Sequence, residues 1–331
     1  MQILVLKSKE MKNVLSMREA IQADKDALAL YSEGKVNIPL RVNLDIPEQE
    51  GQSLYMPGYA ADAQALGVKI VSVYPRNIEK GLTSVPATMV LVNTETGQVC
   101  SIMDGTYLTQ LRTGAVAGAA TDLLAREDSS VFTLIGTGGQ AETQLEAVLA
   151  VRPIKKVNVF DLDTKRAEEF AKNMIKLYGE KYQTVIKATT ILEDAIRESD
   201  IITSVTTSPV KTFSGTWVKP GTHINGVGSY TSQMAEIDPV ILQIAGKVYC
   251  DTEDALVESG DFTQAVEKGL YDVADVTGEL GDILNRVAPG RESEEEITFF
   301  KSTGNAVLDI VTAQRIYEAA VKKEIGSLLE F

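Results

Sequence analysis

The residues best suited to chemistry lie in a glycine-rich loop near the middle of the chain. Residues 135–141 read Ile-Gly-Thr-Gly-Gly-Gln-Ala, a G-x-G-x-x-A pattern between a predicted strand at 131–135 and a predicted helix at 140–151. The first glycine permits a tight turn, the second lets the backbone approach a pyrophosphate, and the alanine permits close contact between helix and strand. The free N–H groups that open the helix favour phosphate binding. The residues predicted to contact a dinucleotide here are Gly136, Gly138, Gly139, Gln140 and Ala141.

An acidic residue follows the next predicted strand, at 156–160. Asp161 lies 25 residues after Gly136, close to the interval of about 20 residues expected for the acid that binds the adenosine ribose. A carboxylate here accepts hydrogen bonds from the ribose hydroxyls and repels a 2′-phosphate, so the sequence favours NAD over NADP. Lys165 and Arg166 leave tolerance for NADP. The alternative role for Asp161 is that of a surface residue at a strand end.

Small hydroxyl residues end a later predicted strand, at 201–205. Ser204 and Thr206 lie in the run Ser-Val-Thr-Thr. Side chains of this size suit the wall of a nucleotide crevice at the carboxyl end of a strand. An ordinary polar transition from strand to loop explains them equally well, so their cofactor contact is a hypothesis.

Three cations in the first third of the chain could bind a carboxylate. Lys69 lies in an apolar run, where spacing alone favours an outward position. A lysine in a pocket instead could pair with a carboxylate or carry a proton to a reacting nitrogen. Arg41 and Arg112 are as ambiguous individually, although arginine can bind a carboxylate through two hydrogen bonds. His223, the single histidine, is interpreted as structural, and no metal site is predicted.

The predicted elements divide the chain into two domains. Between 131 and 250, strands and helices alternate in the βαβ order of a doubly wound parallel sheet. The preceding strands follow one another without helices, which predicts a mostly antiparallel sheet. We therefore predict an α/β protein with a Rossmann domain at 119–305 and a second, mixed α+β domain formed by 1–118 with 306–331. Its predicted elements include a strand at 3–6, a helix at 16–33 capped by Ser16, strands at 41–46, 53–56, 68–74, 87–93 and 99–104, and helices at 108–126 and 306–324.

Composition excludes several classes of protein. The chain has 331 residues with 46 acidic and 32 basic side chains, a net charge of −14. This balance argues against nucleic-acid and anionic-membrane partners, because both require a basic surface. The first residues lack the features of a signal peptide, and no apolar stretch approaches the ~20 residues of a membrane span. Cys100 and Cys250 are predicted to be buried free thiols, and we expect a cytoplasmic protein.

Four segments together resemble the ornithine cyclodeaminase/mu-crystallin family, and the likeness runs over nearly the whole chain. They are Arg-Thr-Gly-Ala-Val-Ala-Gly at 112–118, the glycine loop at 135–141, His-Ile-Asn-Gly-Val-Gly at 223–228 and Ser-Thr-Gly-Asn-Ala at 302–306. The resemblance implies a Rossmann domain and a substrate domain built from both chain ends, with dimerisation through the substrate domain. It also implies an enzyme that acts on small amino acids or cyclic imino acids.

The resemblance assigns further roles by position. Arg41, Lys69 and Arg112 match substrate-binding cations, and Lys69 also matches an acid–base residue. The positions of Gly136, Gly138 and Asp161 match dinucleotide contacts. Thr113 matches a contact on the phosphate side, while Val227 and Ser302 match residues that line the nicotinamide.

One position departs from the family pattern. Tyr230 stands where the cyclodeaminases and archaeal-type alanine dehydrogenases have an aspartate. A tyrosine with a pKa near ~10 is a poor base at neutral pH. We therefore favour an NAD(H)-dependent imine reductase, such as one that converts Δ1-pyrroline-2-carboxylate to proline, or an amino-acid dehydrogenase. The alternatives are an ornithine cyclodeaminase that recycles NAD, and a non-catalytic mu-crystallin-like binding protein.

Overall fold

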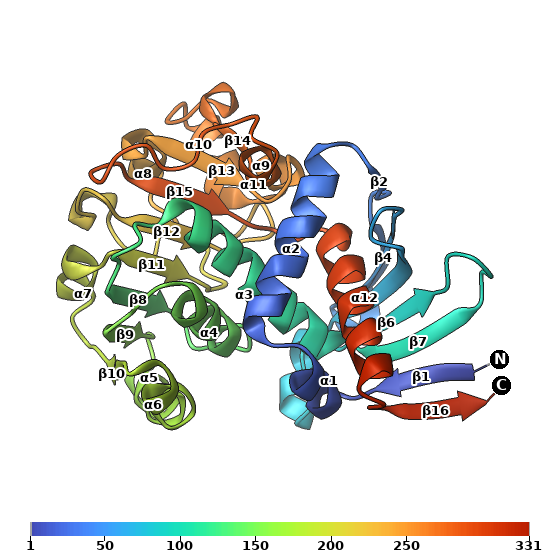
Figure 1. Cartoon of the computed structure of the whole chain (residues 1–331). Coiled ribbons are helices and arrows are strands. Elements are labelled where there is room, and N and C mark those ends of the chain that lie inside the picture. The colour runs from blue at the N-terminus through green and yellow to red at the C-terminus, as the bar shows by residue number, and fades with distance from the viewer. Residues whose placement is uncertain (1, 331) are drawn as a thin grey trace. The chain divides into compact units, whose positions relative to one another are not determined.

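The computed structural model describes residues 2–330 and divides the chain into two compact units. Unit 1 comprises Met1–Arg112 with Asn305–Phe331, and unit 2 comprises Thr113–Gly304. The division falls inside helix α3 (Gly105–Leu124), earlier than the boundary predicted after residue 118. A continuous helix therefore crosses from one unit to the other, which a search for linkers in the sequence could not reveal. In Figure 1 the two chain ends lie side by side on strands β1 and β16 of unit 1.

Unit 1 is built on one mixed sheet with the strand order β16-β1-β7-β6-β5-β4-β2, and β3 also pairs with β4. Its neighbouring strands are antiparallel except for the parallel pair β1–β7, which confirms the mostly antiparallel prediction. The strands are β1 (Gln2–Leu6), β2 (Val36–Asn37), β3 (Val42–Ile46), β4 (Gly51–Ala60), β5 (Ala65–Val73), β6 (Ala87–Val92), β7 (Val99–Asp104) and β16 (Ser327–Glu330).

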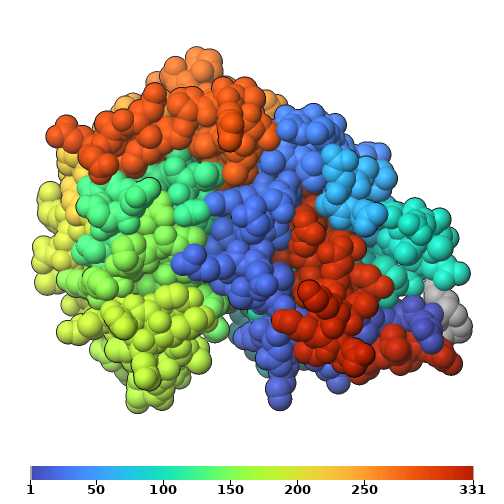
Figure 2. All heavy atoms as spheres, in the orientation of Figure 1, coloured from blue at the N-terminus to red at the C-terminus, as the bar shows by residue number. Residues whose placement is uncertain are grey.

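One long helix covers part of this sheet, and a second long helix packs on the first. Helix α12 (Ala306–Lys322) contacts β4, β5 and β6, and α2 (Met17–Ser32) packs against α12. Figure 2 shows α2 in blue beside α12 in red. Ser16 caps α2 and forms the predicted capping box with Glu19. The remaining helices of unit 1 are α1 (Ser8–Val14), η1 (Pro47–Gln49) and η2 (Pro75–Lys80).

Unit 2 is a doubly wound sheet with the strand order β10-β9-β8-β11-β12-β15-β13-β14, and its described strand pairs are parallel. The first six strands in this list reproduce the 3-2-1-4-5-6 order of the Rossmann fold. The strands are β8 (Val131–Ile135), β9 (Lys156–Phe160), β10 (Val185–Ala188), β11 (Ile201–Ser204), β12 (His223–Gly226), β13 (Lys247–Cys250), β14 (Gly278–Glu279) and β15 (Thr298–Lys301).

Apolar side chains bury both faces of this sheet. One core contains Ile201 of β11, and another contains Ile202, the next residue along the same strand. Alternate residues of a strand point to opposite faces, so helices must cover both sides. The helices are α4 (Ala141–Val151), α5 (Thr164–Met174), η3 (Ile175–Gly179), α6 (Glu180–Tyr182), α7 (Leu192–Glu198), η4 (Gly215–Trp217), α8 (Pro239–Ile244), α9 (Asp254–Glu258), α10 (Gly260–Glu267), η5 (Val273–Asp275) and α11 (Leu280–Leu284).

Several details differ from the sequence predictions, among them the following three. Asp163, rather than Thr164, caps α5, because its carboxylate accepts hydrogen bonds from two backbone N–H groups of the first turn. Strand β15 was not predicted, since its four residues lie beside an acidic loop and show no alternation. Cys250 is buried, whereas Cys100 is only half-buried, and both are free. Among residues 2–330, no helix is long and apolar enough to cross a membrane.

Candidate active site

Unit 1 contains a buried cluster of opposite charges. Lys69 on β5 is 1% exposed, and its Nζ lies 2.6 Å from Oδ2 of Asp309, which is fully buried in the first turn of α12. The Nε atom of Arg112 on α3 lies 3.0 Å from Oδ1 of the same carboxylate. The outward position that spacing favoured for Lys69 is therefore wrong. Its inward position is tolerated because Asp309 provides the counter-charge that a buried ammonium needs.

The environment of Lys69 lowers the pKa of its ammonium group. Burial lowers its pKa, Asp309 raises it, and the charges of Arg112 and Arg41 lower it again. The result is a pKa of about 8, well below the usual range of a lysine. A lysine of this kind is protonated at neutral pH yet can release its proton to a reacting nitrogen. Arg41, which immediately precedes β3, is half-buried and close enough for its charge to act on Lys69.

A second buried aspartate, Asp24, lies next to this cluster, but it forms no ion pair with any residue that the structure describes. Asp24 on α2 is fully buried, and Thr312 Oγ1 donates a 2.8 Å hydrogen bond to its Oδ1. Burial raises the pKa of Asp24 well above its usual value. Its Oδ2 is buried without a hydrogen-bond partner in the structure, a position that suits a neutral acid better than a carboxylate.

The cluster therefore carries uncompensated positive charge. Two cations, Lys69 and Arg112, share the single carboxylate of Asp309, while burial raises the pKa of the nearby Asp24 and so favours its neutral form. An excess of one positive charge in a buried setting favours a ligand with a carboxylate. Sequence reasoning missed both aspartates. The available signal was an acidic residue inside an apolar helical run, Ala-Val-Leu-Asp-Ile-Val at 306–311.

The glycine loop of unit 2 has the geometry that its pattern predicts. Gly136 follows β8 with a φ of +98°, and a Cβ there would lie 2.8 Å from the carbonyl oxygen of Val205. Glycine is therefore required at this turn. A Cβ on Gly138 would meet nothing within 4 Å, so the backbone there is open to a ligand. Gly139 is exposed, Gln140 precedes α4 without a side-chain cap, and Ala141 is buried at its start. The loop and helix terminus thus fit a pyrophosphate.

Asp161 lies directly beside this loop. Its Oδ2 accepts hydrogen bonds from the backbone N–H of Thr137 at 2.9 Å and the Thr137 hydroxyl at 2.6 Å. Its Oδ1 accepts one from the N–H of Asp163. Partial burial raises the pKa of Asp161, but these hydrogen bonds outweigh burial and the net shift is downward. The group is thus a carboxylate at neutral pH, held at the end of β9 where a ribose-binding acid is expected.

Two other predicted cofactor residues, Val227 and Ser302, follow strands at the same edge of the unit 2 sheet, while Thr113 lies in helix α3. Thr113 is buried and its carbonyl accepts a hydrogen bond from Gln144. Val227 follows β12 and is mostly buried. Ser302 follows β15, and its hydroxyl donates a 2.7 Å hydrogen bond to Asp251. The contact of these three residues with a cofactor therefore stays a prediction.

The hydroxyls of Ser204 and Thr206 are occupied by a residue that sequence reasoning missed. Both donate to Oε2 of the fully buried Glu236, at 2.7 Å and 3.0 Å. These two hydrogen bonds therefore hold the end of β11 against the buried Glu236. Nothing in the local sequence indicates Glu236, because it lies in an irregular segment between β12 and α8.

His223 is fully buried in β12 and hydrogen-bonded on both ring nitrogens. Nδ1 lies 2.9 Å from Thr298 Oγ1 and Nε2 lies 3.0 Å from Asn225 Oδ1. Burial lowers its pKa to about 3, so the ring is neutral at physiological pH. This arrangement supports the structural interpretation of His223.

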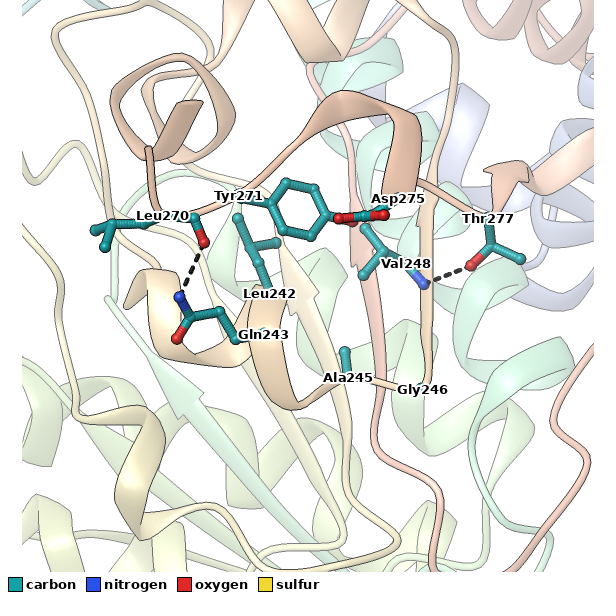
Figure 3. A pocket seen from close by; sticks show the side chains of 9 residues that line it. All are labelled: Leu242, Gln243, Ala245, Gly246, Val248, Leu270, Tyr271, Asp275 and Thr277. Atoms are coloured by element: carbon teal, nitrogen blue, oxygen red, sulfur yellow. Dashed lines mark hydrogen bonds between the residues drawn. The ribbon is translucent and has the colours of Figure 1, made fainter. Parts of the chain in front are cut away.

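A separate cavity of about 340 Å³ lies at the start of β13 (Figure 3). The Gln243 amide donates to the carbonyl of Leu270, and Thr277 Oγ1 accepts from the N–H of Val248, so much of its polar lining is already paired. It contains none of the predicted site residues. Its lining residues are Leu242, Gln243, Ala245, Gly246, Val248, Leu270, Tyr271, Asp275 and Thr277.

The strand order, the glycine loop and the acid after β9 define a protein of the dinucleotide-binding Rossmann class, with a second unit that carries a buried cationic cluster. The sequence pattern of the ornithine cyclodeaminase/mu-crystallin family matches residues 1–324, and the chain belongs to this family.

Named relatives cover the full chain. A Δ1-pyrroline-2-carboxylate reductase of Bacillus cereus (strain ZK / E33L) is 37% identical over 330 residues, 99% of this chain and 100% of the relative. An alanine dehydrogenase of Archaeoglobus fulgidus is 38% identical over 333 residues, 100% of this chain and 99% of the relative.

Solved structures agree with this assignment. The Thermococcus litoralis Δ1-pyrroline-2-carboxylate reductase in complex with NADH and L-proline superposes with a TM-score of 0.92 and 38% identity, covering 98% of this chain and 99% of that one. An archaeal alanine dehydrogenase dimer with bound NAD gives a TM-score of 0.90 at 38% identity, with full coverage of both chains. The family and the fold expected from the sequence are confirmed.

Proposed function

We propose that this protein is an NAD(H)-dependent oxidoreductase that acts on the carbon–nitrogen centre of a small amino acid or cyclic imino acid. Relatives at 37% and 38% identity over the whole chain are a Δ1-pyrroline-2-carboxylate reductase and an alanine dehydrogenase, which both fit this description. The loop at 135–141 and Asp161 suit NAD in unit 2, and the cluster around Asp309 suits a carboxylate substrate in unit 1.

The observation that carries the proposal is the buried Lys69–Asp309–Arg112 cluster. Its excess positive charge attracts the α-carboxylate that imino acids and amino acids share. Arg112 can turn its terminal guanidinium nitrogens to that carboxylate, since its Nε is the atom paired to Asp309. Arg41 is the predicted second cation for the same group.

Lys69 is the proposed proton carrier. When bound, NADH would supply the hydride for the imine carbon, and the product nitrogen would keep one proton. With a pKa of about 8, Lys69 holds that proton at neutral pH and can share it with the substrate nitrogen. Asp309 keeps the ammonium in place because it binds Lys69 at 2.6 Å. In the opposite direction, unprotonated Lys69 accepts the proton from an amino acid.

Asp161 makes NAD the preferred cofactor in this proposal. Its carboxylate is fixed at the end of β9 by Thr137 and Asp163. A 2′-phosphate would meet this negative charge, while ribose hydroxyls could donate to it. Lys165 and Arg166 in the first turn of α5 leave some tolerance for NADP.

Net hydride transfer is favoured over the redox-neutral cyclodeaminase reaction. Tyr230 is half-buried, and burial raises its pKa further above the ordinary value of 10. It therefore cannot serve as a base at neutral pH in place of the aspartate expected from the family pattern, although its hydroxyl can donate a hydrogen bond. Alanine dehydrogenation is the second candidate, supported by the A. fulgidus relative.

The testing experiment separates these reactions. Purified protein is given NADH with Δ1-pyrroline-2-carboxylate, NADH with pyruvate and ammonia, or NAD with ornithine, lysine or alanine, while absorbance and free ammonia are followed. Rapid loss of NADH with the cyclic imine supports imine reduction, and rapid loss with pyruvate and ammonia supports alanine dehydrogenation. Ammonia release from ornithine at constant NADH would overturn the proposal, as would the absence of turnover in every arm. Cofactor binding without turnover would favour the non-catalytic alternative.

We also propose that the protein is a homodimer in the cytoplasm. Unit 1 exposes large apolar side chains near β3 and η2, among them Leu40 at 76% and Ile78 at 71%, and the archaeal alanine dehydrogenase is a dimer. Two free thiols suit a reducing compartment. Light scattering on the purified protein tests the dimer, and a monomeric mass would contradict it.

A further inference from the structure

A buried glutamine connects helix α3 to the helix that begins at the phosphate loop. Gln144 lies near the start of α4 and is fully buried. Its Nε2 donates a 2.8 Å hydrogen bond to the backbone carbonyl of Thr113 on α3. Thr113 directly follows Arg112, the cation that pairs with Asp309. One hydrogen bond and one peptide unit therefore connect Gln144 to the backbone of Arg112.

The two helices are in close contact at this point. A Cβ on Gly114 would lie 2.6 Å from the carbonyl oxygen of Thr143 and 2.8 Å from its Cβ, so the contact requires glycine. Thr143 Oγ1 in turn donates a 3.0 Å hydrogen bond to the carbonyl of Gln140, which belongs to the loop at 135–141. Helix α3 thus packs on the turn of α4 that directly follows the phosphate-binding glycines.

The environment of Gln144 is unfavourable for an amide. Its Oε1 is buried and has no hydrogen-bond partner among the residues that the structure describes. Leu145 and Val148 of the same helix belong to the apolar core of unit 2. A buried amide oxygen without a donor lowers stability, whereas an apolar side chain of similar size avoids this cost. What a glutamine provides here, and an apolar residue would lack, is the hydrogen bond to Thr113.

The position of Arg112 relative to the phosphate loop matters if both take part in one reaction. Reacting atoms must be held about 3–3.5 Å apart, and a displacement of about 1 Å can slow a reaction by about a hundredfold. Arg112 is the proposed anchor of the substrate carboxylate, and the loop at 135–141 is the proposed anchor of the cofactor pyrophosphate. Helix α3 passes from unit 1 to unit 2 between Arg112 and Thr113. The hydrogen bond from Gln144 therefore acts where the substrate anchor joins the cofactor-binding unit.

We propose, on the basis of the proposed function, that Gln144 is a positioning residue that fixes Arg112 relative to the phosphate-binding turn of α4. It acts through the carbonyl of Thr113 and the continuous backbone of α3, and it contacts neither ligand. Loss of its amide leaves both ligand sites intact but changes the distance between them. Hydride transfer should therefore slow more than the binding of either ligand weakens.

The test is Gln144→Met, which keeps the length of the side chain and removes the amide. Wild type and variant are compared in thermal unfolding, in fluorescence titration with NADH, and in single-turnover oxidation of NADH by Δ1-pyrroline-2-carboxylate. We expect an unchanged or higher melting temperature and an unchanged dissociation constant for NADH. The rate of hydride transfer should fall by about tenfold or more. The isotope effect on kcat with NADH deuterated at its transferable position should rise, because the hydride step becomes slower.

Thr121→Val is the matched control. Thr121 lies eight residues after Thr113 on α3, and its Oγ1 accepts a 3.0 Å hydrogen bond from Nδ2 of Asn225. Both side chains are fully buried, and Asn225 Nδ2 also donates to Thr203, so the variant leaves that amide with an acceptor. The control thus removes a bond of the same kind between α3 and the rest of unit 2, but about two helical turns from Arg112. Its hydride-transfer rate should equal that of the wild type.

The outcomes separate a positioning role from a structural one. A lower melting temperature with an unchanged rate would make Gln144 only structural and would overturn the proposal. Equal losses of NADH affinity and of rate, or the same loss of rate in Thr121→Val, would also overturn it. If Gln144→Met does not fold, Gln144→Asn replaces it; this amide is one methylene too short to reach Thr113, and the same loss of rate is expected. Failure of the wild type to bind NADH, or to turn over either the imine or pyruvate with ammonia, would refute the proposed function instead.

Discussion

Asp309→Asn is the substitution that most directly perturbs the unit 1 cluster. The side chain keeps its shape but loses the charge that pairs with Lys69 at 2.6 Å and with Arg112 at 3.0 Å. Removal of one member of a buried ion pair costs about 3–5 kcal/mol, since the partner charges remain buried. We therefore expect a lower free energy of unfolding by this amount in urea titrations.

The same substitution should shift the pH dependence of the reaction. Asp309 is the group that raises the pKa of Lys69 against the lowering effects of burial, Arg112 and Arg41. Without it, the pKa should fall from about 8 by roughly one to three units. Lys69 would then be largely unprotonated at neutral pH, and the pH above which kcat/KM for imine reduction declines should move by that interval to lower pH.

Asp24→Asn provides the matched control. Asp24 is buried in the same region, but burial raises its pKa and so favours its neutral form. Replacement by a neutral amide should change the free energy of unfolding by less than about 1.5 kcal/mol and leave the pH profile in place. The reasoning is refuted if Asp309→Asn keeps the wild-type profile, or if both asparagine variants shift it equally.

Further predictions address the cofactor loop and the proton carrier. For the wild type, kcat/KM for imine reduction should fall as pH rises through about 8, because Lys69 loses its proton there; a flat profile from pH 6 to pH 10 would exclude Lys69 as the donor. Asp161→Ala should weaken NADH binding by about tenfold or more and narrow the preference over NADPH, as measured by fluorescence titration, and unchanged affinities would remove Asp161 from its role. Gly138→Ala should fold normally, because its Cβ meets no atom within 4 Å, but should bind NADH poorly. Gly228→Ala should instead lower the melting temperature, because its Cβ would lie 2.0 Å from the Thr206 carbonyl oxygen; thermal unfolding that ranks these two glycines in the opposite order would contradict both assignments.

Much of unit 2 could be predicted from sequence because its signals are local. The turn at Gly136, the helix start at Ala141 and the acid at Asp161 lie within about 25 residues, and each has a physical requirement that fixes the residue type. Strand β15 escaped prediction because its place in the sheet depends on β12 and β13, which lie more than forty residues earlier in the chain.

The charged clusters could not be predicted because they depend on tertiary contacts. Lys69 and Asp309 lie at opposite ends of the chain, and only the packing of α12 against β5 brings them together. Spacing alone pointed Lys69 outward. Glu236 could not be predicted for the same reason, since its five donor groups come from two separate segments, at the ends of β11 and β12. The family resemblance identified the cations by position but gave no reason for their burial.

The most direct test of the central claim follows the hydride itself. NADH deuterated at its transferable position is incubated with the protein and Δ1-pyrroline-2-carboxylate, and the proline formed is analysed by mass spectrometry and NMR. We predict one deuterium per molecule at the α-carbon, with one NADH consumed for each proline. Proline without deuterium, or no proline despite tight NADH binding, would contradict hydride transfer to this substrate.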